Sequence, residues 1–168
     1  LWVDVADKHK GLRFDGRIAE DFKLATGTFV SVGPLRGRVI AGGAPYIQDV
    51  VVTGLNRHEV GALVFPTQAV RSLVDLPPDA PFETVLKQHA VLQKFQSLVT
   101  DLSLTATGAA NRVTRLMLMA EPPSIDLGEV TDKGSINQRA VLKHRDALVQ
   151  ALYDETPGHI VIKPGVNL

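Results

Sequence analysis

The sequence predicts an α+β fold, with a small mixed sheet and flanking helices. Three observations support this prediction. Short apolar runs bounded by glycine or proline are typical of strands. Longer segments repeat apolar residues every three or four positions, as one face of a helix does. The two kinds of segment do not alternate regularly along the 168 residues, so a regular α/β architecture is not expected.

The first residues predict a separate small unit. Leu1–Val5 alternates apolar and polar side chains, and Gly11–Phe14 is expected to pair back with it as a hairpin. Residues 1–15 are therefore expected to form a linker hairpin that leads from a preceding domain. Residues 16–155 are expected to form the domain itself, and residues 156–168 a tail.

Two strands and a helix are expected next. Phe22–Leu24 and Thr28–Val32 flank a turn that ends at Gly27, where glycine supplies backbone freedom. Pro34–Gly43 is expected to be helical, because proline is tolerated in the first turn of a helix and glycines end the segment.

The most apolar strand is expected at Ile47–Thr53, with Gly61–Phe65 as its partner. Pro66 stops the second strand, since proline cannot donate to a ladder. Thr67–Leu73 is expected to be a short helix. A further strand is expected at Arg112–Ala120, closed by two prolines.

Two longer helices complete the pattern. Apolar residues recur at three and four positions from Pro81 to about Asp101, which predicts a helix. A second helix is expected from Ser135 to about Tyr153, with Ser135 and Gln138 forming a capping box. In the tail, His159–Lys163 is expected to add an edge strand.

Composition excludes several classes of protein. The 18 basic and 18 acidic side chains balance, which argues against a nucleic-acid partner. Because cysteine is absent, disulfides and cysteine–zinc sites are excluded. The sequence contains no run of 18 apolar residues, so no membrane span is predicted. The first residues lack the features of a signal peptide. We expect a single cytoplasmic domain.

Side chains suited to binding or catalysis are concentrated in two segments. The five histidines are scattered, so no metal site is expected. In Asp15–Arg36, Arg17 is suited to clamp a phosphate or ribose, although a surface ion pair with a nearby acid explains it equally well. In Thr131–Ser135, Lys133 precedes a predicted helix N-terminus, a place where anions bind; an ordinary loop is the alternative.

The sequence resembles the C-terminal domain of acyl-adenylate-forming (AMP-binding) enzymes, and most narrowly that of feruloyl-CoA synthetases. Three blocks carry the resemblance: GRIAEDFKLATGTFVSVGPLR at 16–36, PYIQDVVVTGLNRHEVGALVFP at 45–66 and RVTRLMLMAEPPSIDLGEVTDKGSINQRAVLKHR at 112–145. Gly-Arg alone is a weak signal, but the three blocks in this order are a specific one.

The resemblance implies a fold, a reaction and partners. The fold would be the C-terminal lid domain of the adenylate-forming superfamily. An aromatic acid such as ferulate and ATP, with Mg²⁺, would form an acyl-adenylate and pyrophosphate. The lid would then rotate, and coenzyme A would release AMP and form the thioester. The acid pocket would belong to an N-terminal domain of the same polypeptide, so this chain alone is expected to be inactive.

The resemblance also implies roles for residues of the first block. Arg17 matches the arginine that contacts the nucleotide. The hinge position falls on Ala19, next to Glu20, where the family has aspartate or lysine. Gly27 matches a glycine beside the path of coenzyme A, and Lys23 lies on the same CoA-facing edge.

The last block departs from the family at the catalytic lysine. The family has a Gly-Lys step that contacts the carboxylate and phosphate, but here Gly134 precedes Ser135. We expect Lys133 to substitute, because the transition state accumulates negative charge. Arg139 is the alternative.

Two other functions remain open from the sequence. A related adenylating enzyme would load a carrier protein instead of coenzyme A. A non-catalytic interaction module would keep the fold without the chemistry. The resemblance also implies that residues at about 75–110 are a helical insertion, because the family's domain is usually shorter there. This predicted insertion has two candidate roles, docking the large domain and forming a homodimer.

Overall fold

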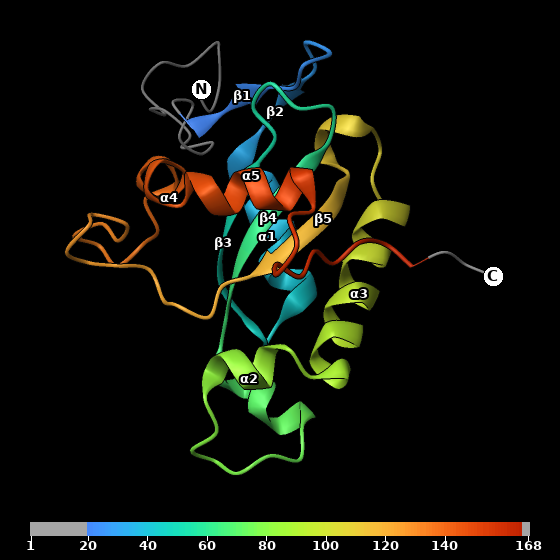
Figure 1. The fold of residues 1–168 in the computed structure, drawn as a ribbon. Coiled ribbons are helices and arrows are strands. Elements are labelled where there is room, and N and C mark those ends of the chain that lie inside the picture. Colours follow the sequence, from blue (N-terminus) through green and yellow to red (C-terminus); the bar gives the residue numbers. More distant parts are fainter. Residues whose placement is uncertain (1–19, 166–168) are drawn as a thin grey trace, which may run out of the picture.

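The computed structural model describes residues 20–165. Its centre is a three-stranded sheet in the order β3–β4–β5 (Figure 1). β3 (Ile47–Thr53) and β4 (Val60–Pro66) are antiparallel, and β5 (Val113–Leu118) runs parallel to β4. The sheet is therefore mixed, as predicted.

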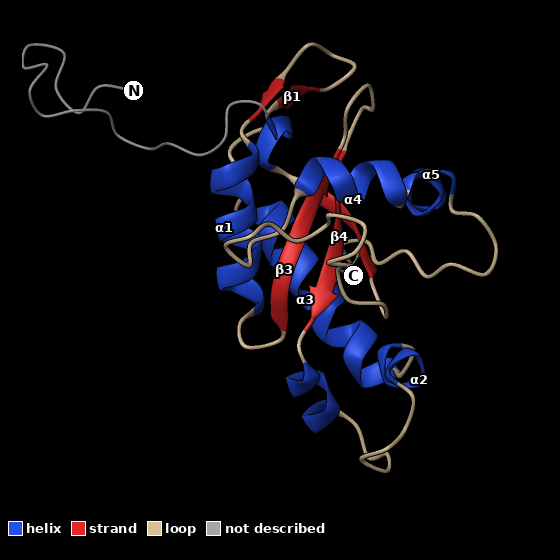
Figure 2. Cartoon of the chain, turned by 90° about the vertical axis from the view of Figure 1, so that its left-hand side faces the viewer, coloured by secondary structure: helices blue, strands red, loops and turns tan. Residues whose placement is uncertain are grey.

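Both faces of this sheet are covered by helices (Figure 2). Side chains alternate between the faces of a strand, so Val50 and Val52 join one core while Val51 joins the other. Burial on both faces explains why β4 and the Val50–Val52 part of β3 are apolar runs. It also explains why their bounds were readable: Ile47–Thr53 is confirmed, and Gly61–Phe65 is extended by one residue at each end.

α1 (Val32–Gly43) and α3 (His89–Leu104) cover one face. The single helix expected from Pro81 to about Asp101 is wrong, because Gln88 is extended and separates α2 (Phe82–Leu86) from α3. In one straight helix, Leu86 and Val91 would point about 140° apart, at about 100° per residue. The break lets both side chains reach the core.

The predicted insertion contributes to this main core. Phe95, Val99 and Leu102 of α3 are buried against the sheet and α1. The boundary of the insertion itself stays a prediction.

α4 (Gln138–His144) and α5 (Asp146–Asp154) cover the other face. The continuous helix expected from Ser135 to Tyr153 is wrong at its start and in its middle. It begins at Gln138, and Arg145 leaves the helical conformation with φ −107° and ψ 26°. The side chain of Arg145 bonds to a distant segment, which is described below.

The remaining elements are short. β1 and β2 are an antiparallel pair of two residues each, shorter than expected, because Val32 already begins α1. The tail adds one antiparallel bridge to β5, between Ile162 and Leu116, where an edge strand was expected. These short elements are β1 (Phe22–Lys23), β2 (Phe29–Val30), and the 3₁₀ helices η3 (Gln68–Leu73) and η4 (Ala109–Asn111).

Candidate functional site

The first predicted segment forms a compact hairpin, which we call the Lys23 hairpin (residues 22–30). The amide of Leu24 donates to Thr28 at 2.9 Å, and that of Gly27 donates to Leu24 at 2.8 Å. Gly27 has φ +84° and open space around it. Lys23 is exposed while Leu24 is buried, as the alternation of a strand requires. The hairpin therefore presents Lys23 and Gly27 to solvent.

The Lys23 hairpin is fixed to the main sheet through the β3–β4 loop. The amide of Ala25 donates to Arg57 at 2.8 Å, and that of Asn56 donates to Lys23 at 3.4 Å. Leu24 packs beside Gly54 of the same loop. These contacts hold the hairpin at one end of the sheet.

The second predicted segment is also a hairpin, whose tip we call the Lys133 turn (residues 131–135). Val130 and Ile136 form an antiparallel bridge below it. The amide of Thr131 donates to Ser135 and that of Gly134 donates to Thr131, both at 2.8 Å. Gly134 has φ +79°, and Lys133 is exposed at the tip.

Ser135 does not cap a helix, which corrects the expected capping box. Its hydroxyl lies 2.8 Å from the Thr131 hydroxyl, because the bridge keeps the chain extended to Ile136. Asn137 caps α4 instead, and its side chain accepts from the Ala140 amide at 3.2 Å.

The root of the Lys133 turn rests on a buried ion pair. Glu129 is only 1% exposed and accepts from Arg145 at 2.9 and 3.1 Å. It also accepts from the Ser124 amide at 2.7 Å. Hydrogen bonds from Arg145 outweigh burial and hold the pKa of Glu129 below its usual value.

The Lys23 hairpin and the Lys133 turn lie apart in the structure. In Figure 1 the Lys23 hairpin lies at the top, beyond the β3–β4 loop, whereas the segment that carries the Lys133 turn lies at the side, beyond α4. Each is exposed at its own surface of the same domain.

The remaining predicted residues lie near the start of the chain. Arg17 and Ala19 fall outside the described residues, and so does the linker hairpin at 1–15. Glu20 is half-buried immediately before β1. Its neighbour Asp21 has a structural role that the sequence did not predict. The Asp21 carboxylate accepts from the Val32 amide at 2.9 Å and so satisfies a donor in the first turn of α1. Eleven positions separate the two, so no local pattern predicts this contact.

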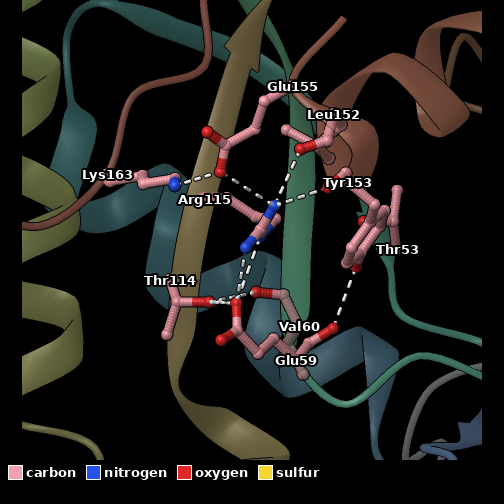
Figure 3. Close-up of polar contacts among 9 residues, drawn as sticks. All are labelled: Thr53, Glu59, Val60, Thr114, Arg115, Leu152, Tyr153, Glu155 and Lys163. Atoms are coloured by element: carbon pink, nitrogen blue, oxygen red, sulfur yellow. Dashed lines mark hydrogen bonds and ion pairs between the residues drawn. The ribbon is translucent and has the colours of Figure 1, made fainter.

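Sequence reasoning also missed a cluster of charges around Arg115 (Figure 3). Arg115 pairs with Glu59 at 2.8 Å and donates to the Leu152 carbonyl at 2.9 Å. Burial opposes ionisation of Glu59, but hydrogen bonds from Arg115 and Thr114 prevail and lower its pKa. The cluster joins β4, β5 and the end of α5.

Neither a metal cluster nor a membrane helix is found in the described part of the chain. Within residues 20–165, no three histidine or acidic side chains are grouped so that they could hold a metal ion. The helices described here are too short or too polar to cross a bilayer.

Comparison with known families shows which family this domain belongs to. Residues 21–157 match the family described as the AMP-binding enzyme C-terminal domain. The chain belongs to this family. A search of curated proteins gave no match. The α+β fold predicted for a C-terminal domain of AMP-binding enzymes is confirmed, although the narrower feruloyl-CoA synthetase type is not distinguished.

Solved structures share the fold of this AMP-binding enzyme C-terminal domain. The adenylation domain of carboxylic acid reductase from Segniliparus rugosus, with AMP and a co-purified carboxylic acid, has a TM-score of 0.58 at 21% identity. The alignment covers 84% of this chain and 21% of that one. The A-PCP didomain of the same enzyme, with AMP, has a TM-score of 0.56 at 20% identity, covering 81% and 17%.

A third structure is the adenylation domain of the carboxylate reductase from Mycobacterium chelonae. Its TM-score is 0.57 at 20% identity, and the alignment covers 83% of this chain and 20% of that one. The chain thus spans about a fifth of the length of these adenylating proteins.

Proposed function

We propose that this chain is the C-terminal lid of an aromatic acid–CoA ligase of the feruloyl-CoA synthetase type. The reaction would activate the acid with ATP and Mg²⁺ and then transfer the acyl group to coenzyme A. The sites for ATP, coenzyme A and the acid would be shared with an N-terminal domain of the same polypeptide, in the cytoplasm. The 75–110 segment would either dock the N-terminal domain or form a homodimer.

One observation supports the proposal above the others. The Lys23 hairpin and the Lys133 turn are both exposed, are both closed by backbone hydrogen bonds, and lie at separate surfaces. In the proposed reaction, the domain would present these two edges in turn to one active site, one edge for each half-reaction. Family membership supplies the adenylation chemistry to which such a domain contributes.

Lys133 would act in the first half-reaction. A carboxylate oxygen of the acid attacks the α-phosphorus of ATP, the bond to the β-phosphate breaks, and pyrophosphate leaves. Lys133 is a cation at an exposed tip, suited to stabilise the charge that develops on the carboxylate and phosphate. Arg17 would contact the nucleotide, with Ala19 and Glu20 at the pivot.

The Lys23 hairpin would act in the second half-reaction. The thiol of coenzyme A loses its proton and attacks the acyl carbonyl, and AMP leaves as the acyl–oxygen bond breaks. Gly27 has nothing within 4 Å of the position of a Cβ, so its backbone is open to a pantetheine chain. Lys23, on the same edge, would face the coenzyme.

Transfer to a carrier protein is the second candidate. The similarity to an A-PCP didomain of a carboxylic acid reductase favours it. A non-catalytic interaction module is the third candidate, and it predicts no activity at all.

ATP–pyrophosphate exchange in the complete enzyme tests the proposal. With ferulate we expect exchange, and Lys133→Ala should lower it about a hundredfold or more, as the loss of one preorganised charge-stabilising donor does. Lys143→Ala, at an exposed lysine of α4, should leave exchange unchanged. If Lys133→Ala has no effect while Ser135→Lys raises exchange, the assignment of Lys133 is wrong.

Release of AMP separates the remaining candidates. Release that requires coenzyme A supports the ligase, whereas release that requires a carrier protein supports the second candidate. Absence of exchange with any acid supports the interaction module. Ferulate ligation by this chain alone would contradict its assignment as a lid.

A further inference from the structure

We propose that Glu129 and Arg145 are a positioning pair that holds the Lys133 turn in place for adenylation. The inference rests on the proposed function, in which Lys133 serves the first half-reaction. Neither residue touches substrate in this proposal. They act through the backbone of the turn.

Glu129 stands at the root of the Lys133 turn. Its backbone carbonyl accepts from the Asn137 amide at 2.8 Å, and the bridge between Val130 and Ile136 follows directly. Lys133 lies four residues further along the chain. Fixing Glu129 therefore fixes the strand from which the lysine projects.

Arg145 connects this root to the body of the domain. Besides Glu129, its guanidinium donates to the carbonyls of Glu121 at 3.1 Å and Pro122 at 2.9 Å. It also lies over the ring of Phe65, at 5.0 Å from the centroid, and Phe65 is buried in β4. One side chain thus joins both ends of the 121–129 loop to the sheet.

The other root of the turn is fixed independently. The buried side chain of Gln138 accepts from the Val52 amide of β3 at 3.0 Å. With both roots tied to the sheet, the exposed tip has little freedom except in the lysine side chain itself. Enzymes need this precision, because a displacement of about 1 Å at a reacting group can cost about a hundredfold in rate.

A second arginine–carboxylate pair in the same domain supplies the matched control. Arg115 and Glu59 form a similar pair at 2.8 Å, on the edge of the sheet near the end of α5 (Figure 3). No hydrogen bond among the described residues links Glu59 to the Lys133 turn. Glu59→Gln therefore removes an arginine–carboxylate pair of the domain without disturbing the turn, at a smaller cost in stability because the Glu59 side chain is 47% exposed.

The experiment compares Glu129→Gln with Glu59→Gln in the complete enzyme. Amide hydrogen exchange is measured at Thr131 and Gly134, whose N–H groups close the turn. We expect Glu129→Gln to speed exchange at both amides about tenfold or more, and Glu59→Gln to leave them at the wild-type rate. In kinetics, Glu129→Gln should lower the kcat of ATP–pyrophosphate exchange about tenfold with the KM for the acid unchanged. Thioester formation from preformed acyl-adenylate should remain at the wild-type rate.

Each outcome has a separate meaning. Unchanged amide exchange in Glu129→Gln overturns the positioning pair. Equal losses in both half-reactions also overturn it, because they indicate general destabilisation. If the wild-type enzyme shows no pyrophosphate exchange, the proposed function fails, and the amide exchange still decides whether the pair holds the turn.

Discussion

The hydroxyl groups of Tyr153 and Thr53 lie 2.9 Å apart although a hundred positions separate them in the chain. Tyr153 also donates to the Glu59 carbonyl at 2.9 Å, and Arg57 and Arg115 lie against its ring, 4.7 and 5.1 Å from the centroid. Burial, the largest influence, raises the pKa of Tyr153 above its usual value. The end of α5 is thereby joined to the β3–β4 loop that supports the Lys23 hairpin.

Tyr153→Phe should lower the free energy of unfolding by about 1–2 kcal/mol, since it removes the hydroxyl bonds and keeps the ring contacts. Urea unfolding measures the change. Tyr46→Phe is the control, because the Tyr46 hydroxyl has no hydrogen bond among the described residues, and it should change stability by less than about 0.5 kcal/mol. Equal effects of the two substitutions would contradict the role of the Tyr153 hydroxyl.

Two glycines predict opposite effects of the same substitution. A Cβ at Gly61 would lie 2.8 Å from both Arg115 and Thr53, so Gly61→Ala should destabilise by about 1–3 kcal/mol through overpacking. A Cβ at Gly37, exposed within α1, meets nothing within 4 Å. Gly37→Ala should therefore stabilise by about 0.5–1 kcal/mol. Melting temperatures of the two variants should move in opposite directions, and a shared direction would contradict the packing described for β4.

Under the proposed function, substitutions of the glycines in the Lys23 hairpin and the Lys133 turn should impair different half-reactions. Gly27 and Gly134 have φ +84° and +79° with open space around each, so alanine imposes a similar strain of about 1–2 kcal/mol at either one. Gly134→Ala should slow adenylation, and Gly27→Ala should slow thioester formation, each about tenfold for a small displacement. Rapid-quench measurement of the two half-reactions tests this. If both variants lose the same half-reaction, the assignment of the Lys133 turn to adenylation and of the Lys23 hairpin to thioester formation is wrong.

The Glu129–Arg145 pair predicts a dependence of stability on pH. The folded-state pKa of Glu129 is lowered from 4.5, so the stability from its ionised form is complete above that value and is lost as pH falls through 4.5 toward the folded pKa. Near pH 7, Glu129→Gln should cost on the order of 3 kcal/mol by leaving Arg145 without its carboxylate. The gap between the urea unfolding free energies of wild type and variant should narrow below pH 4.5. A gap that is constant with pH would show that folding does not lower the pKa of Glu129.

Local pattern was sufficient to predict some elements and insufficient for others. Ile47–Thr53 was predicted with its observed bounds because its run Val50–Val52 is apolar and buried on both faces of the sheet, and Gly54 follows the strand. Ser135 was misassigned because serine followed by glutamine three residues later fits a capping box, whereas the actual cap is Asn137. Both residues suit a helix start, and only the bridge between Val130 and Ile136 selects between them.

By itself, the sequence determined the α+β class and the strands of the main sheet to within one or two residues, because these depend on local periodicity and turn chemistry. Its three blocks also identified the family. Tertiary structure alone decided where helices break and which polar groups meet. At the break between α4 and α5, the guanidinium of Arg145 bonds to Glu129, sixteen positions earlier. Periodicity encodes which side of an element is buried, but the partner of a charged or polar group is set by chain segments that only folding brings together.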